Sequence, residues 1–99
     1  MNIKLINRGE EGELVLEGHL DSYTSVDAEK IFLQTAERFQ KVVLNMEGVT
    51  YVSSAGLRII KLLYMAMTKK NGSLVLTHVQ KMVMEVFEIT GFVGLLTIE

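Results

Sequence analysis

The chain has 99 residues, of which 48% are hydrophobic and 22% are charged, and its formal net charge is −2. This length predicts one compact domain, because two hydrophobic cores could not both be filled. The small negative charge gives no basic field for nucleic acid or anionic lipid, so neither is expected as a partner.

Cysteine is absent, which excludes disulfides, thiolate nucleophiles and cysteine-ligated zinc sites. The chain shows no signal-peptide pattern, and no apolar run approaches the ~18 residues of a membrane-spanning helix. We therefore expect a cytoplasmic protein without a membrane partner.

The chain begins with the pattern of an antiparallel hairpin. Residues 3–6 and 13–17 are strand-like and flank a glycine-bounded turn at 9–12. A loop is expected at 18–21, before the first helix.

That helix is expected from about Thr24, with Thr24 as its N-cap and Asp27 at the third helical position. Four apolar or aromatic residues at helical spacing predict its buried stripe. They are Ala28, Phe32, Ala36 and Phe39.

The middle of the chain predicts a βαβ unit. Residues 42–44 are apolar throughout, as in a central strand covered on both faces, and strand-like residues continue at 49–52. A helix over 54–70 is expected to end before Asn71-Gly72, and strand 74–76 follows at once. The two strands should therefore lie parallel, which makes the fold α/β with a mixed sheet.

A last helix is expected over residues 81–90, with Gly91 as its C-terminal stop and residues 95–98 as a short edge strand. One apolar face of this helix is predicted from its spacing. It comprises Met82, Val83, Val86 and Phe87.

The helix over 54–70 separates into two faces at about 100° per residue. The face expected in the core holds Gly56, Ile60, Leu63, Tyr64 and Met67. The opposite face holds Ser54, Arg58, Lys61 and Met65, with Leu62 and Lys69 at its flank. This mixed basic and apolar face is a candidate partner-docking surface; the alternative is an ordinary solvated helix face.

Ser53 and Ser54 stand where the apolar segment meets this helix. A helix start offers free backbone N–H groups, so a phosphate is tolerated there, whereas a docked partner would feel repulsion. Arg58, one turn on, could pair with such a phosphate. The alternative is that one of the two serines only caps the helix.

Catalysis is not expected. His19 and His78 have no metal-ligand spacing, and the chain has neither a glycine-rich phosphate loop nor a Gly-x-Ser-x-Gly elbow. We therefore predict no enzyme activity, no metal and no cofactor.

Four segments stand in order along the chain: 18–21 (Gly-His-Leu-Asp), 42–47 (Val-Val-Leu-Asn-Met-Glu), 51–57 and 89–92 (Ile-Thr-Gly-Phe). Together they resemble the STAS domain, specifically the small anti-sigma factor antagonists of bacterial partner-switching systems. The resemblance covers nearly the whole chain, and it implies a single STAS domain over residues 1–99 with the STAS-type fold.

The resemblance implies a non-catalytic protein that binds an anti-sigma factor, itself a serine kinase, and so releases the sigma factor. Phosphorylation ends this binding, and a serine phosphatase resets the protein. Alignment on Gly56 and Leu57 puts the phosphorylated residue at Ser54. Ser53 stands where the family often has aspartate and is the alternative site, while Ala55 replaces a second hydroxyl residue.

Asp21 matches the family's loop aspartate, which implies a role in phosphorylation and kinase recognition; the alternative is an Asx turn before the first helix. Asn45 is expected to anchor a loop through its amide and not to be a site. The expected partner-binding residues are Asp21, Ser53, Ser54, Arg58, Lys61, Leu62 and Met65.

A second function remains open, in which the chain is a constitutive STAS regulatory subunit of a lipid-transport, secretion-regulating or stressosome-like complex. Such a subunit would bury a larger apolar patch against its partner. An antagonist should instead be a free monomer with an exposed serine, and Ser54 favours this reading.

Overall fold

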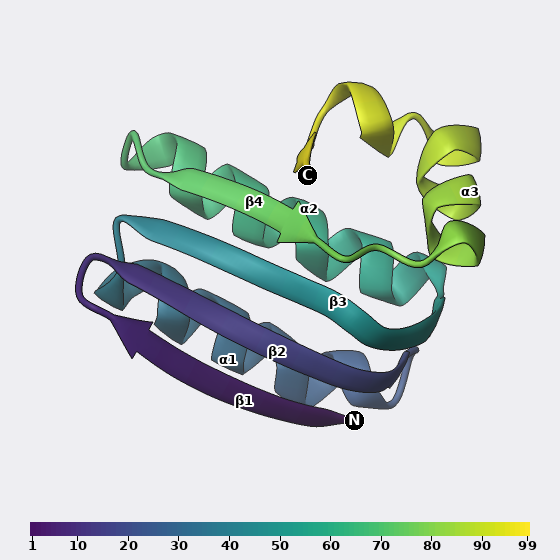
Figure 1. The fold of residues 1–99 in the computed structure, drawn as a ribbon, viewed down its shortest axis with the longest axis horizontal. Coiled ribbons are helices and arrows are strands. Elements are labelled where there is room, and N and C mark those ends of the chain that lie inside the picture. The colour runs from purple at the N-terminus through teal and green to yellow at the C-terminus, as the bar shows by residue number, and fades with distance from the viewer.

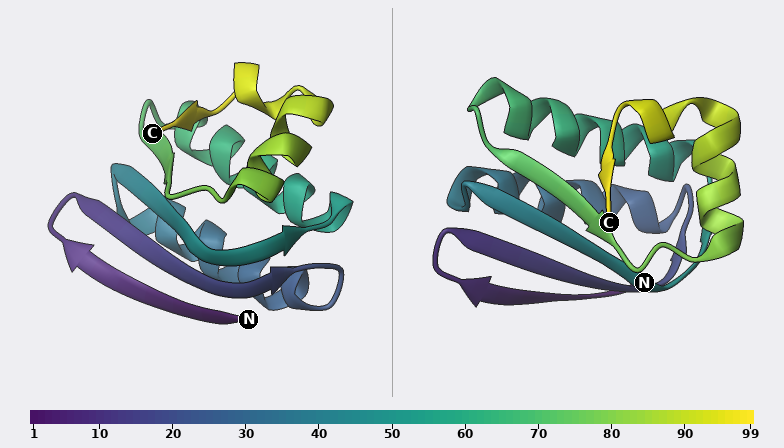
Figure 2. Two further views of the ribbon diagram at one scale, coloured as in Figure 1. Left: turned by 45° about the vertical axis from the view of Figure 1, so that its right-hand side comes forward. Right: turned by 45° about the horizontal axis from the view of Figure 1, so that its top comes forward.

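The computed structural model describes all residues from 1 to 99 and has one sheet of five strands, in the spatial order β1-β2-β3-β4-β5. The strands are β1 (Asn2–Arg8), β2 (Glu11–Leu20), β3 (Lys41–Val52), β4 (Ser73–Thr77) and β5 (Thr97–Ile98). The helices are α1 (Thr24–Arg38), α2 (Ser54–Lys69), α3 (Lys81–Thr90) and the short 3-10 helix η1 (Phe92–Gly94). Figure 1 shows α1 and α2 behind the sheet and α3 at its right-hand end, and Figure 2 shows the same arrangement from two more sides.

The expected hairpin is confirmed, because β1 and β2 pair antiparallel. The turn is shorter than residues 9–12, since Arg8 already pairs with Glu11 and only Gly9 and Glu10 connect the strands. Gly9 has a φ of 82°, which glycine adopts without strain. Gly12 lies within β2, where a Cβ atom would stand 2.5 Å from the ring of Phe39.

The expected loop at 18–21 is wrong for most of its length, because β2 runs on to Leu20 and pairs in parallel with β3. Two register shifts interrupt this pairing, and Gly18 has a φ of 116°. A glycine followed by a polar residue is a sequence pattern typical of loops. Here the same pattern belongs to a strand with a bulge.

The predicted core positions of α1 and β3 are confirmed. All four residues of the predicted stripe are buried, although Phe39 follows α1 as its extended C-cap, and Val42, Val43 and Leu44 in the middle strand are buried too. Val43 pairs in register with Glu13 on one side and with Val75 on the other. Its neighbours in the sheet therefore shield a face that no helix covers, and Val43 lies outside the main core cluster. The expectation that this strand is covered on both faces is thus wrong, because α1 and α2 lie on the same side of the sheet (Figure 1).

The βαβ unit is confirmed, since β3 and β4 are parallel and α2 connects them. The core face of α2 is broader than predicted: Leu57 and Ile59 are also buried, whereas Tyr64 is only half-buried. The buried face is broader because α2 packs against both the sheet and α1, and so has two neighbouring sides in contact with the core.

The C-terminal elements agree with the sequence in most respects. Gly91 ends α3 in the left-handed conformation, and Phe87 is fully buried. Met82 departs from the prediction because it is 73% exposed. β5 contains only Thr97 and Ile98, parallel to β4. None of the helices is long and apolar enough to cross a membrane.

Candidate functional site

The Ser53-Ser54 corner is tied to the end of the neighbouring strand. Leu20 pairs with Val52, and the Ser53 amide donates a hydrogen bond of 2.9 Å to the Leu20 carbonyl. A Cβ atom on Gly56 would lie 2.7 Å from the same carbonyl oxygen. Glycine at this position therefore lets the first turn of α2 lie directly on the ends of β2 and β3.

The two serines have different surroundings. Ser53 is the N-cap of α2, and its half-buried hydroxyl oxygen accepts a hydrogen bond from the Gly56 amide at 3.4 Å. Ser54 is the first residue of α2, is exposed, and its hydroxyl makes no hydrogen bond within the chain. The capping role that the sequence left open between the two therefore belongs to Ser53.

Asp21 forms the Asx turn that leads into α1. One of its carboxylate oxygens accepts hydrogen bonds from the amides of Tyr23 at 2.9 Å and Thr24 at 3.0 Å. The Thr24 hydroxyl forms hydrogen bonds with residues that precede it in the chain: it accepts from the Asp21 amide and donates to the His19 carbonyl. The prediction of Thr24 as N-cap is therefore wrong, because Thr24 is already the first residue of α1 and its amide donates to Asp21. Asp27 is consequently the fourth helical residue and not the third.

The structure thus supports the local role of Asp21, while its role toward a kinase stays a prediction. Its pKa is lowered, chiefly because the carboxylate accepts the backbone hydrogen bond from Thr24; the bond from Tyr23 also lowers it, and desolvation opposes them. The folded protein therefore favours the charged form of Asp21.

Asp21→Asn is expected to be less stable than the wild type at neutral pH, and the difference should shrink in acid. A lowered native pKa gives stability that is fully present above the unfolded-state pKa and is lost as pH falls through the native value. Urea unfolding at neutral pH and at about pH 3 would measure this. A stability difference that does not change with pH would contradict it.

The outer face of α2 is exposed as the helical wheel predicts. Ser54, Arg58, Lys61 and Met65 are exposed, and Leu62 at the flank is half-buried. Arg58 forms an ion pair of 2.7 Å with Glu29 of α1, whereas Lys61 forms none. The pairing of Arg58 with a phosphate stays a prediction, and Glu29 would compete with that phosphate.

Asn45 anchors an irregularity in β3 and not a loop. Its side-chain oxygen accepts from the Glu47 amide, and its side-chain nitrogen donates to Glu13 at 3.1 Å. These contacts lie where the pairing of β2 with β3 shifts register. The hydrogen bond from Asn45, together with one from Arg8, lowers the pKa of Glu13.

The sequence analysis predicted no site role for two exposed tyrosines at this end of the sheet, where Leu20 of β2 pairs with Val52 of β3. Tyr23 follows the Asp21 turn and is 89% exposed, and Tyr51 at the end of β3 is 51% exposed. The ring of His19 contacts that of Tyr51 edge-on, with centroids 5.7 Å apart. Exposed tyrosines favour partner contacts. The signal was available for Tyr51, which belongs to the 51–57 segment.

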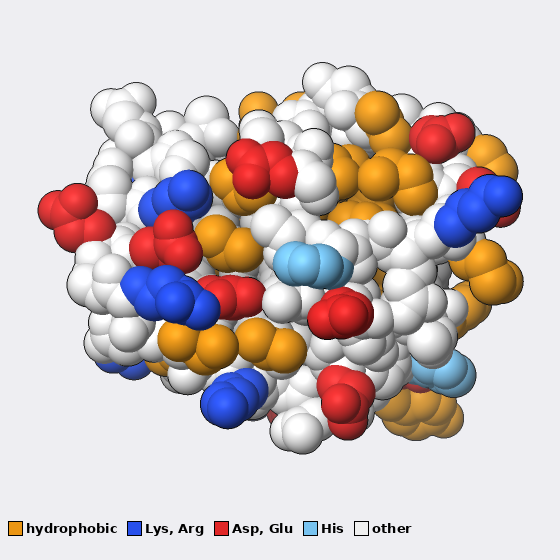
Figure 3. Space-filling model, in the orientation of Figure 1, with side chains coloured by type: hydrophobic (Ala, Val, Ile, Leu, Met, Phe, Trp, Pro, Cys, Tyr) orange, Lys and Arg blue, Asp and Glu red, His pale blue; other side chains and the backbone are white.

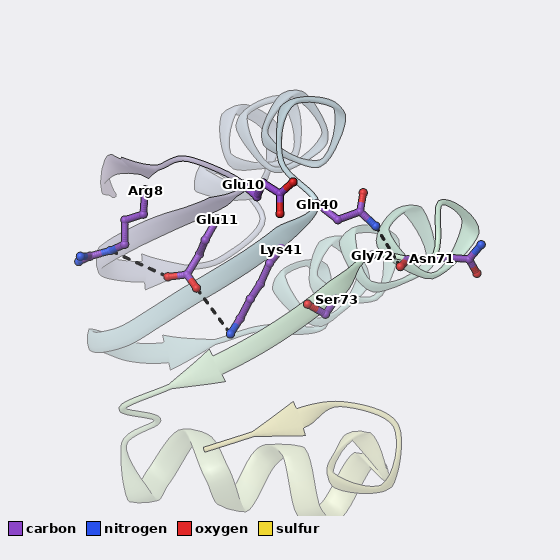
Figure 4. A pocket seen from close by; sticks show the side chains of 8 residues that line it. All are labelled: Arg8, Glu10, Glu11, Gln40, Lys41, Asn71, Gly72 and Ser73. Carbon is purple, nitrogen blue, oxygen red and sulfur yellow. Dashed lines mark hydrogen bonds and ion pairs between the residues drawn. The ribbon is translucent and has the colours of Figure 1, made fainter.

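A polar hollow of about 500 Å³ lies at the opposite end of the sheet, where β3 and β4 begin (Figure 4). Three of its four charged side chains are already paired, since Glu11 forms ion pairs with both Arg8 and Lys41, and Glu10 forms none. The amide of Gln40 donates to the Asn71 carbonyl. The hollow is thus lined by the turns at the end of the sheet where β3 begins. Ser54 follows the other end of β3, so it lies outside this hollow. No group of three acidic, histidine or cysteine residues that could hold a metal exists in the chain.

Comparison with known families identifies the fold. The model of the STAS domain family matches residues 4–99. The chain therefore belongs to the STAS domain family, and its α/β fold with a mixed sheet is the STAS fold.

One relative and several solved structures are similar to this chain. The "Putative anti-sigma factor antagonist BtrV" of Bordetella bronchiseptica is 37% identical over 75 residues, which cover 72% of this chain and 65% of the relative. The match thus spans slightly less than two thirds of that relative.

Two solved structures share the fold. The structure of "a putative anti-sigma factor antagonist" from Thermotoga maritima has a TM-score of 0.90 and 15% identity, covering 97% of this chain and 84% of its own. The phosphorylated form of the Bacillus protein SpoIIAA has a TM-score of 0.78 and 15% identity, covering 99% and 91% respectively. At this identity these structures inform us about the fold alone.

Proposed function

We propose that this protein is a cytoplasmic anti-sigma factor antagonist that acts by partner switching. Its unphosphorylated form binds an anti-sigma factor with serine kinase activity and so releases a sigma factor. Phosphorylation of Ser54 ends that binding, and a serine phosphatase restores it. Family membership and the name of the Bordetella relative support this proposal. The observation that carries it is the exposed, unbonded hydroxyl of Ser54 at the first position of α2.

The surroundings of the two serines favour Ser54 over Ser53 as the acceptor. A phosphate on Ser53 would remove the hydroxyl oxygen from the Gly56 amide and would have to enter a half-buried position. A kinase must bring the acceptor hydroxyl in line with the γ-phosphate of ATP. Ser54 can meet that requirement without breaking a bond within the domain.

The phosphate would act on the partner more than on the fold. It adds about −1.5 to −2 charges at neutral pH, and the free amides of a helix start tolerate an anion. The same charge would oppose a partner docked over Ser54, Arg58 and Met65 through repulsion and desolvation. The domain itself needs no acid, base or cofactor for this role, because the kinase supplies the chemistry.

The test uses Ser54→Ala and Ser54→Asp, with Ser53→Ala as the matched control. Intact-mass and peptide mass spectrometry after incubation with the anti-sigma kinase and ATP should locate one phosphate on Ser54. Ser54→Ala should keep the affinity for the kinase, and Ser54→Asp should lose about tenfold or more. Ser53→Ala should still be phosphorylated, although it loses a helix cap worth about 1 kcal/mol.

Two results would contradict the proposal in different ways. A phosphate found on Ser53 would keep partner switching and move its site. An absence of phosphorylation by any kinase of the same cell, together with stable co-purification in a larger complex, would favour the constitutive regulatory subunit.

A further inference from the structure

We propose that the outer side of α3 is a second docking surface, which receives an amphipathic helix carrying lysine or arginine residues beside its apolar stripe. This proposal does not rest on phosphorylation of Ser54. It concerns Met82, Val86 and Ile89 of α3, here called the α3 stripe, and Tyr51 at the end of β3.

The α3 stripe is apolar and faces solvent. Met82 is 73% exposed, Ile89 is 85% exposed, and Val86 is half-buried between them. Their spacing of four and three residues places them on one line along the helix. The buried attachment of α3 is made by Val83 and Phe87, and Val86 also packs partly against the core. Met82 and Ile89 contribute little to this attachment and remain exposed to solvent.

The α3 stripe adjoins a hollow of about 240 Å³ between α3 and the end of β3. Its six lining residues are mostly hydrophobic: Thr50, Tyr51, Val52, Met82, Val83 and Val86. The α3 stripe runs from Met82 to Ile89, so at 1.5 Å per residue the exposed line is about 10 Å long. A line of this length that ends in a hollow suits a partner helix of about two turns, with one side chain inserted into the hollow.

The charges beside the α3 stripe favour a cationic partner. Glu85 and Glu88 are exposed on α3, and neither forms an ion pair. Lys81 at the start of α3 is also exposed and unpaired, so the helix carries two acidic residues and one basic residue. Figure 3 shows hydrophobic side chains at the surface over α3, on the right of the view, with both acidic and basic side chains next to them. Two unpaired carboxylates would attract lysine or arginine at the edge of a docked helix and would repel an anionic membrane.

The test uses a synthetic helical peptide of leucine and lysine with leucine at positions i, i+3, i+4 and i+7. A second peptide of the same composition, with its leucines spread around the helix, is the control. In NMR titrations of the isotope-labelled domain, the first peptide should shift the amides of α3 and of Tyr51. The control peptide should bind about tenfold more weakly or not at all.

Variants separate the α3 stripe from the rest of the surface. The double variant Met82→Gln, Ile89→Gln should lose about tenfold or more in affinity for the peptide. Val26→Gln, which changes a valine that is 60% exposed on α1, should leave the affinity unchanged. Glu85→Gln with Glu88→Gln should weaken binding and reduce its dependence on salt. Circular dichroism should show all variants folded.

Three outcomes would overturn the proposal. The α3 variants could bind the peptide as well as the wild type, or the shifts could fall on α2 instead. Sedimentation could also show self-association that is lost in the double α3 variant, which would make a second copy the occupant. Ser54→Asp should bind the peptide like the wild type, so this result is independent of the outcome of the phosphorylation test.

Discussion

Gly56→Ala is expected to destabilise the domain by about 3 kcal/mol. The new Cβ atom would lie 2.7 Å from the Leu20 carbonyl oxygen and 3.0 Å from a methyl group of Val52. That carbonyl cannot move freely, because it also accepts the hydrogen bond from Ser53. The first turn of α2 must therefore lift from the strand ends, and urea unfolding would measure the cost.

Gly94→Ala is the matched control. Nothing lies within 4 Å of a Cβ atom at Gly94, so this variant should keep its stability within about 0.5 kcal/mol. Equal stability of both alanine variants would mean that α2 is not packed against β2 at Gly56. A destabilised Gly56 variant should also show altered phosphorylation of Ser54, since the corner that presents the serine would move.

Phe87→Ala should cost about 3–5 kcal/mol, because it leaves a cavity beneath α3. Phe87 is fully buried, and its ring stacks on that of Phe92 with centroids 6.2 Å apart. It is therefore the main attachment of α3 and η1 to the rest of the core. Thermal and urea unfolding would measure the loss.

Ile89→Ala provides the comparison on the same helix. Ile89 is 85% exposed, so its truncation should change stability by less than about 0.5 kcal/mol. Similar losses for Phe87→Ala and Ile89→Ala would contradict the division of α3 into a buried and an exposed apolar side. The comparison therefore also examines the assumption on which the α3 docking surface depends.

Local periodicity was sufficient to predict much of this fold. The hairpin, the βαβ unit and the exposed face of α2 follow from patterns within single elements. Met82 was placed wrongly because α3 has apolar residues on two sides, and spacing alone does not tell which side meets the core. The continuation of β2 through Gly18 was missed because a bulged strand lacks the alternation that marks a regular one.

The parts of the candidate site that depend on residues close together in the sequence could be predicted. The parts that depend on how separate elements pack together could not. A serine at a helix start is visible in the sequence, although only the hydrogen bond to the Gly56 amide assigns the cap to Ser53. The ion pair between Arg58 and Glu29 joins residues 29 positions apart on two helices. Its prediction would require the relative placement of α1 and α2, which one sequence does not supply.

The spatial order of the strands is the same as their order along the chain. During synthesis on the ribosome, each strand after the first therefore finds its partner already made, and no strand has to enter between two others. The contacts of Ser53 with Leu20 involve only residues made before α3 and β5. The corner that presents Ser54 can thus assemble before α3 and β5 join the domain.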